Sequence, residues 1–221
     1  MKIFEHKSTP KLTEMETISI NGKRHYTTPE RNIYPSITTI LSVLSRDGIA
    51  AWRNKVGEKE ASRISTQAAR RGTNVHQMAE DYLNNNLNLK GFLPNERILF
   101  KPIQKAVDTS IGKIYAQEAP LYSDHLGVAG RVDCVAEWDG RLSIIDFKTS
   151  RKLKKKEWVG SYFQQTAAYA IMWEERTGIP IDKLVIIIAC DDNDTAQVFV
   201  EKRDNWYKDL INTIKEYHQE N

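Results

Sequence analysis

Two aspartates and a lysine lie close together in the stretch GRVDCVAEWDGRLSIIDFKTS. The pair Asp139-Gly140 is favoured in two-residue type I′ hairpins, and both flanking runs are strand-like. With this pair as the loop, Asp133 lies opposite Asp146, and facing side chains of an antiparallel pair share one side of the sheet. Lys148 follows Asp146 by two residues, so its side chain shares that side as well. The pattern therefore predicts a cluster of two carboxylates and one ammonium group.

Three interpretations of this cluster compete, because like charges that face each other destabilise a sheet unless something compensates them. In the first, an ordinary surface hairpin pairs its acids with Arg131 and Lys148, in ion pairs that are worth little. In the second, the acids form a general acid/base couple as in glycoside hydrolysis, a chemistry that has no need of Lys148. In the third, the carboxylates hold a divalent cation such as Mg²⁺, and the lysine suits phosphate chemistry. From the hairpin alone, the first and third interpretations stay open.

Other polar residues favour the metal interpretation when they are taken together. Glu118 lies in the strand-like run before the hairpin and brings a third carboxylate. His76 lies in a helical segment with Glu80 four residues later on the same face. Gln165 and Tyr169 are also four residues apart in a helical segment, so their side chains point the same way. Each of these residues has an ordinary structural explanation when it is taken alone.

The elements that must position these side chains can be predicted from hydrophobic patterning and turn residues. Asn21-Gly22 predicts an N-terminal hairpin, and Ser36 predicts the cap of a short helix. Residues 49–69 have a helical pattern that Gly72 interrupts and a new helix then continues. Further on, helical patterns are expected for LPNERILFKPIQKAVDTSIG, for residues 156–177 and for NWYKDLINTIKEYHQ, and strands for KIYAQEAPLY, the two hairpin arms, LVIIIAC and TAQVFVE. This order predicts an α/β protein with a mixed sheet and a helical N-terminal portion.

Composition limits the class of protein. A chain of 221 residues with 40% hydrophobic and 28% charged residues is typical of one globular domain. No apolar run approaches the ~20 residues that span a membrane, and the first residues lack the apolar segment of a signal peptide, so a cytoplasmic protein is expected. Cys134 and Cys190 both lie in apolar runs and are expected to be buried free thiols. Two cysteines cannot supply a four-cysteine zinc site or iron–sulfur cluster within one chain.

The net charge of +3 is too small to indicate nucleic-acid binding by itself. Two short segments concentrate the positive charge, AARRGT before the hairpin and RKLKKK directly after it. Basic patches attract phosphate backbones, although most lysine runs are only solvated loops.

Several of these segments, in this order, resemble the PD-(D/E)XK nuclease superfamily, specifically its RecB-like branch and the mitochondrial and phage exonucleases within it. The matching elements are YPSITTIL, GTNVH, the strand of Glu118, the hairpin and QQTAAY, and together they cover about residues 34–221. Val132 stands where the name of the superfamily has proline, and Asp146 takes the aspartate option; both occur in this branch. The chain lacks the cysteines of those relatives that carry an iron–sulfur cluster.

The resemblance implies a restriction-endonuclease-like core, with a central mixed sheet flanked by helices. We expect one domain over residues 1–221, in which residues 1–33 form a hairpin extension, residues 34–112 a helical portion or arch, and residues 113–221 the catalytic core.

The resemblance also assigns roles to the clustered residues. Asp133 and Asp146, the backbone carbonyl of Phe147 and the imidazole of His76 are implied to hold Mg²⁺ or Mn²⁺. Lys148 is implied to orient or deprotonate the attacking water and to balance charge on the phosphorane. Further implied roles are a second metal or its water shell for Glu118, support of the site or strand contact for Gln165 and Tyr169, phosphate contacts for Ser36, Thr38 and Arg71, and stacking and phosphate contact for Trp52 and Arg53.

The function implied is a metal-dependent exonuclease that hydrolyses single-stranded DNA ends during replication, repair or recombination, in a bacterial or phage-infected cell. Two alternatives are an endonuclease of the same fold that cuts duplex or branched DNA, and a non-catalytic subunit that binds nucleic acid. No membrane partner is expected.

Overall fold

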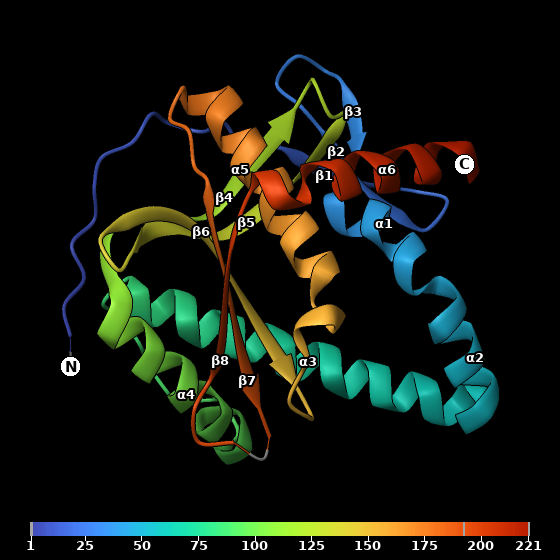
Figure 1. The fold of residues 1–221 in the computed structure, drawn as a ribbon. Coiled ribbons are helices and arrows are strands. Elements are labelled where there is room, and N and C mark those ends of the chain that lie inside the picture. Colours follow the sequence, from blue (N-terminus) through green and yellow to red (C-terminus); the bar gives the residue numbers. More distant parts are fainter. Residues whose placement is uncertain (1, 192, 221) are drawn as a thin grey trace.

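A five-stranded mixed sheet forms the centre of the protein in the computed structural model, which describes residues 2–191 and 193–220 (Figure 1). Its strands lie in chain order, β4-β5-β6-β7-β8, and only β6 and β7 run parallel to each other. The strands are β4 (Ile111–Ser123), β5 (Val128–Trp138), β6 (Arg141–Ser150), β7 (Lys183–Cys190) and β8 (Gln197–Lys202). The predicted α/β class is therefore confirmed.

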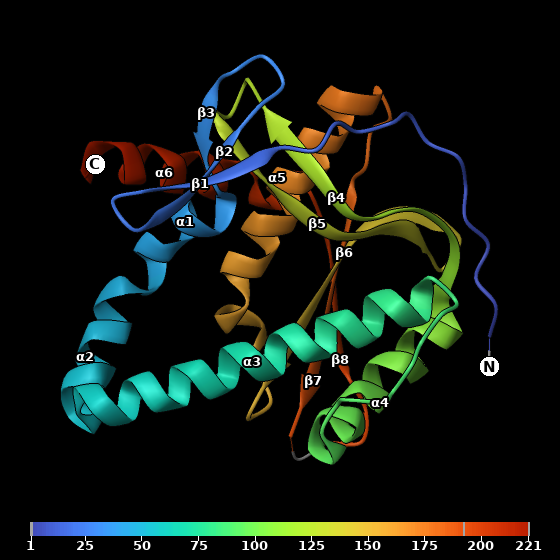
Figure 2. The ribbon, with the colours of Figure 1, turned by 180° about the vertical axis from the view of Figure 1, so that it is seen from behind.

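Helices cover both faces of this sheet. Because parallel neighbours need a crossover connection, the chain between β6 and β7 forms a short 3-10 turn, η2 (Lys156–Trp158), and helix α5 (Gly160–Thr177). Helix α5 and the closing helix α6 (Asp204–Glu220) pack on one face. Helices α3 (Glu58–Leu83) and α4 (Pro94–Ser110) pack on the other, as Figures 1 and 2 show.

Each face of the sheet has its own apolar core. The side chains of β7 alternate between the two cores, so this strand reads as a continuous apolar run. On one face Trp173 is fully buried against the sheet, and on the other Tyr82 is almost fully buried. Both cysteines, Cys134 and Cys190, are free and buried, as predicted.

The N-terminal part forms a smaller sheet and a series of helices. Strands β1 (Glu16–Ile20) and β2 (Lys23–Thr27) form the predicted hairpin, and β3 (Ile33–Pro35) pairs with β2. Ser36 caps α1 (Ile37–Leu41), because the Thr39 amide donates a hydrogen bond of 3.0 Å to its hydroxyl. The 3-10 turn η1 (Ser42–Ser45) and helix α2 (Arg46–Val56) then lead to the far end of α3.

The predicted helix break at Gly72 is wrong. Helix α3 is continuous from Glu58 to Leu83, and the break falls at Gly57, whose φ of 86° ends α2. A glycine inside a helix costs only about 1 kcal/mol relative to alanine. Burial of Val75 and Met78 on the same helix outweighs that cost.

The central hairpin forms as its turn residues predict. Asp139 and Gly140 have φ of 49° and 75°, as a type I′ turn requires. Strands β5 and β6 pair in the predicted register from Trp138–Arg141 to Cys134–Ile145. The backbone pairing stops there, one position before Asp133.

The first residues run along the edge of the sheet as an extended N-terminal strap, residues 2–7. The amide of Lys7 donates to the carbonyl of Ile114 at 2.7 Å, and the amide of Ile114 donates to the carbonyl of Glu5 at 2.9 Å. Phe4 inserts into the core of the α3 side and is 3% exposed, whereas Ile3 is 85% exposed. In the part of the chain that the structure describes, no helix combines the length and apolarity needed to cross a bilayer.

Candidate active site

A cleft of about 680 Å³ lies between the helix α3, the strands β4 to β6, the helix α5 and the small N-terminal sheet. It gathers most of the polar residues that the sequence singled out. Its lining includes Ser36, Thr38, His76, Glu118, Asp133, Lys148, Gln165 and Tyr169.

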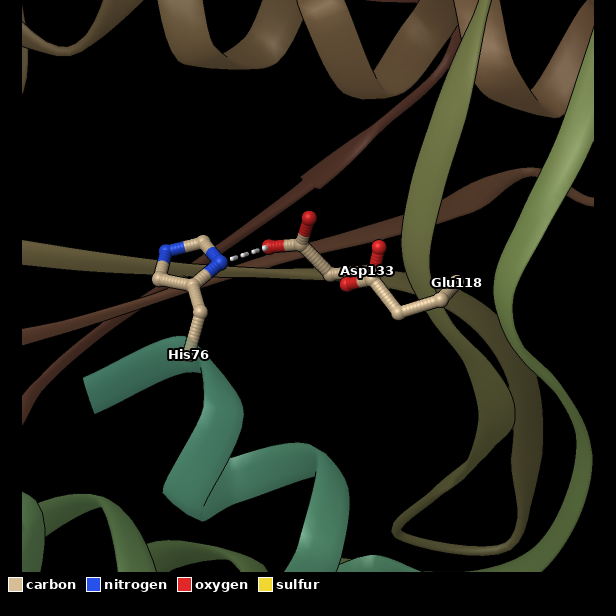
Figure 3. Close-up of side chains that lie close together, drawn as sticks. All are labelled: His76, Glu118 and Asp133. Carbon is tan, nitrogen blue, oxygen red and sulfur yellow. Dashed lines mark ion pairs between the residues drawn. The ribbon is translucent and has the colours of Figure 1, made fainter. Parts of the chain in front are cut away.

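Three residues at this cleft come from three different elements and meet at one point. Figure 3 shows His76 of α3 pointing toward Asp133 of β5, with Glu118 of β4 beside it. One potential ligand atom from each residue lies within 4.8 Å of the others. The Nδ1 atom of His76 is 3.4 Å from Oδ2 of Asp133. One imidazole and two carboxylates are ligands that suit a divalent cation.

The carboxylate of Asp133 also replaces the missing backbone pairing of the hairpin. Its Oδ2 accepts a hydrogen bond of 2.9 Å from the amide of Phe147. The side chain of Phe147 is buried, and its ring meets the His76 ring edge-on at 6.4 Å between centroids. These contacts hold the imidazole and the carboxylate at the same end of β6.

Asp146 and Lys148 form a separate pair behind this group of three. Asp146 is 1% exposed, and its Oδ2 is 2.5 Å from Nζ of Lys148. Nζ of Lys148 also lies 5.3 Å from the centre of the Tyr162 ring. Neither carboxylate oxygen of Asp146 accepts a hydrogen bond of ordinary geometry from the described residues. The facing aspartates of the predicted hairpin therefore have different partners: His76 and Phe147 for one, Lys148 for the other.

The electrostatics of the site indicate an excess of negative charge. Burial raises the pKa of Asp146, an effect that Lys148 opposes and Asp133 reinforces. Burial lowers the pKa of Lys148, but the carboxylates of Asp146 and Asp133 outweigh it, and the net direction is upward. Burial and then the charges of Asp133 and Glu80 raise the pKa of Glu118 to about 7.

A divalent cation fits this site. Acidic oxygens that are buried, crowded together and short of donors are stabilised when a positive charge lies among them. Asp146 supplies two such oxygens. The Glu118 carboxyl group supplies more, and its burial and the nearby acids disfavour its ionised form. The nitrogen of His76 completes a mixed donor set with Asp133.

Comparison with known proteins identifies the family of this chain. Residues 50–220 match the model of the PD-(D/E)XK nuclease superfamily. The chain belongs to this superfamily. It is similar to mitochondrial genome maintenance exonuclease 1 of Mus musculus, with 28% identity over 133 residues, and to that of Homo sapiens, with 26% identity over 136 residues. Each alignment covers 57% of this chain and 39% of the relative, so the chain spans well under half of these relatives.

Among solved structures, the chain is similar to one entitled "Crystal structure of SSO0001", with 13% identity and a TM-score of 0.41. That alignment covers 78% of this chain and 70% of the other.

Helix α5 brings Gln165 and Tyr169 to the same cleft. Both side chains are mostly buried, and burial raises the pKa of the Tyr169 hydroxyl. Gly130 of β5 lies directly beneath this tyrosine, where an added Cβ would be 2.8 Å from its Cε1 atom. The helix and the strand therefore meet at van der Waals distance beside the acids.

The other predicted nucleic-acid contacts divide into two groups. Ser36 and Thr38 line the cleft, and their hydroxyl oxygens are 3.0 Å apart. Trp52 and Arg53 lie on α2 and do not line it, and the guanidinium of Arg53 bonds to Glu58 and Ser62. Arg71 lies on α3 outside the cleft, with Nη1 2.7 Å from the carboxylate of Asp191.

The sequence did not identify the wall that the small N-terminal sheet contributes. Thr17, Arg24 and Tyr26 of β1 and β2 line the cleft opposite α3. The Asn21-Gly22 turn predicted this hairpin but carried no signal of where it docks. Arg131 lines the cleft as well and donates to the carbonyl of Glu118.

Proposed function

We propose that this protein is a metal-dependent exonuclease that hydrolyses phosphodiester bonds at the ends of single-stranded DNA, in replication, repair or recombination. The observation that carries the proposal is the arrangement of the cleft. An imidazole and two carboxylates, His76, Glu118 and Asp133, lie beside the buried Asp146–Lys148 pair in a cleft of about 680 Å³. The similarity to relatives named as exonucleases supports the removal of nucleotides from ends.

In this proposal Asp133, Asp146 and His76 hold Mg²⁺ or Mn²⁺, with help from the Phe147 carbonyl and from Glu118. A cation bound there lowers the pKa of a water molecule and polarises the scissile phosphate. The acids keep the attacking water near the phosphate, and Gln165 and Tyr169 position the strand from the α5 side. Ser36 and Thr38 contribute hydroxyl contacts to its phosphates.

In this scheme Lys148 orients or deprotonates the attacking water and balances charge on the phosphorane. Burial lowers the pKa of this lysine, but the carboxylates of Asp146 and Asp133 outweigh burial, and the net direction is upward. A positive charge that is fixed before the reaction begins stabilises the negative charge that develops on the phosphorane.

The Lys148→Ala variant tests the proposal. We expect it to lose at least ~100-fold of the cleavage rate, because one fixed donor to the developing charge is worth about 2.7–4 kcal/mol. The assay follows end-labelled single-stranded DNA with Mg²⁺ or Mn²⁺. Lys105→Ala is the matched control, because this lysine is exposed on α4 and does not line the cleft.

A circular single-stranded substrate separates the exonuclease from the endonuclease alternative. An exonuclease leaves the circle intact and degrades the linear form of the same sequence. Cleavage of the circle would replace the proposal with the endonuclease, and full activity of Lys148→Ala would refute the assigned site.

A further inference from the structure

The two basic segments that stand apart in the sequence come together in the structure. Arg70 and Arg71 belong to the first segment and lie on α3, while Arg151 opens the second segment directly after β6. All three line one cavity of about 380 Å³, together with Gln67, Ala68, Leu93, Asn95 and Glu96. Segments that are about eighty residues apart in the chain therefore build one positively charged cavity, which we call the arginine cavity.

Glu96, the acid at this cavity, already accepts hydrogen bonds from other residues. Glu96 is 2% exposed and accepts hydrogen bonds from Nδ2 of Asn74 at 2.7 Å and from the amide of Leu93 at 2.8 Å. It also forms no ion pair with the arginines among the described residues. Glu96 offsets one of the three positive charges but occupies no guanidinium donor, so the cavity stays positively charged even with Asp191 beside Arg71.

The arginines retain free donors. Arg71 uses Nη1 for Asp191, but its Nε is buried without a partner among the described residues. Arg70 and Arg151 are exposed and make no hydrogen bond or ion pair that the structure records in the described part of the chain. The rest of the second basic segment differs, because Lys156 pairs with Glu201 and Lys155 lies over the Trp158 ring. Arg151 lines the cavity, whereas Lys155 and Lys156 are engaged elsewhere.

The arginine cavity adjoins the catalytic cleft. Helix α3 crosses β6 at Gly72, where an added Cβ would be 3.9 Å from Oγ1 of Thr149. On one side of this crossing lie Lys148 and His76, which line the cleft, and on the other lie Arg151 and Arg70, which line the cavity. Three residues of extended chain separate Lys148 from Arg151, which is about 10 Å. One nucleic-acid strand can therefore contact both sites.

We propose that the arginine cavity binds the phosphate backbone of the substrate strand beyond the scissile bond. This inference rests on the proposed function and adds a second, non-catalytic contact to it. Guanidinium groups suit this ligand because they bind phosphate oxygens with two parallel hydrogen bonds and stay charged at any physiological pH. Contacts to phosphates carry no sequence information, so this cavity binds strands of any sequence.

The test compares short and long strands on the Arg70→Ala/Arg151→Ala double variant. Binding of a fluorescent thymidine dinucleotide and of an oligothymidylate of about 16 nucleotides is measured without divalent metal over a range of salt, the longer strand within the usual range of single-strand sites. We expect the long strand to bind at least ~10-fold more weakly than to the wild type, and the dinucleotide equally well, because a dinucleotide in the cleft is too short to span the ~10 Å to the cavity. For the long strand, the slope of log K against log salt should fall in magnitude by about 1.4, since each lost phosphate contact accounts for about 0.7.

A matched control removes the same total charge elsewhere. The Arg141→Ala/Lys105→Ala variant loses two exposed cations that line neither site, and it should bind both strands like the wild type. An unchanged salt slope for the long strand in the arginine double variant would overturn the inference, and so would equal weakening of both strands. Failure of this inference is distinguishable from failure of the proposed function. If the wild type binds DNA through these arginines but cleaves no DNA with Mg²⁺ or Mn²⁺, only the proposed exonuclease function is refuted.

Discussion

At the scale of single residues, Asp146 is a buried acid beside the cleft with one charged partner. It is almost fully buried, its Oδ1 atom has no hydrogen-bond donor among the described residues, and burial raises its pKa. One lysine provides its compensation. A buried acid with so few partners is costly unless a further positive charge joins it, and this makes Asp146 the residue whose response to metal is most informative.

The Asp146→Asn variant should lose the stabilisation that Mn²⁺ gives to the wild type. A ligand that binds only the folded state at 100 times its Kd stabilises it by about 2.7 kcal/mol, so the wild type should melt at a higher temperature with the metal. The measurement is thermal unfolding with and without MnCl2, in the absence of nucleic acid. Asp182→Asn is the control, because Asp182 is exposed and pairs with Arg141 far from the cleft. An unchanged shift in Asp146→Asn would remove Asp146 from the metal site.

The backbone of Glu118 has a strained conformation. Its φ of 44° is unusual for a residue other than glycine, and such a conformation costs on the order of 1–3 kcal/mol. The Arg131 side chain holds the carbonyl of this residue, and pairs of β4 with β5 flank it on both sides at Gln117 and Ala119. The surrounding sheet thus fixes a strained backbone at the point where the Glu118 carboxylate joins the cluster, a common property of functional sites.

At the scale of elements, the close crossing of β5 and α5 sets the shape of the cleft. Gly130 has no Cβ, and this lets Tyr169 of α5 approach the strand; an added Cβ would be 2.9 Å from its hydroxyl oxygen. Cβ atoms essentially never make contacts this short, so any larger residue at this position must displace the tyrosine.

The Gly130→Ala variant should destabilise the fold by about 1–3 kcal/mol, the usual cost of overpacking a filled site. Urea unfolding measures the change. Gly48→Ala is the control, because this glycine is exposed on α2 with nothing within 4 Å of an added Cβ, and it should be neutral or slightly stabilising. Equal stability of the two variants would show that Tyr169 moves without cost.

The elements also show how far local sequence signals reach. The hairpin was predictable to the residue, because a two-residue turn fixes the register of its own strands. The continuity of α3 through Gly72 was not, because packing of distant residues decided it. Local patterning placed Asp133, Asp146 and Lys148 in one region, whereas His76 was assigned to the same site as Asp133 only through the resemblance. Neither showed that Lys148 pairs with Asp146 apart from the group of His76, Glu118 and Asp133.

At the scale of the whole molecule, the two cores on the two faces of the sheet depend on different parts of the chain. The core beneath α5 and α6 includes residues of α1, whereas the core beneath α3 and α4 takes Phe4 from the N-terminal strap. The Phe4 ring meets that of Tyr82 edge-on at 5.3 Å, close to the helix that carries His76. The strap thus supports the helix that positions one of the proposed metal ligands.

The Phe4→Ala variant should lower the free energy of unfolding by about 3–5 kcal/mol, the range for removing a buried phenylalanine. Ile3→Ala, one residue away on the same strap but largely exposed, should change it by no more than about 0.5 kcal/mol. Chemical denaturation of both variants gives the comparison. If the two losses are equal, the strap contributes nothing to the core.

The parallel pairing of β6 with β7 has a consequence for the assembly of the cleft. Because these strands run in the same direction, the chain needs a crossover connection over one face of the sheet before β7 begins. Helix α5 is that connection. The obligatory return passes over the acids and delivers Gln165 and Tyr169 to them. The connectivity of the chain therefore determines the shape of the cleft. Any rearrangement that made β7 antiparallel to β6 would remove the wall that α5 provides, although every residue of the cleft would be unchanged.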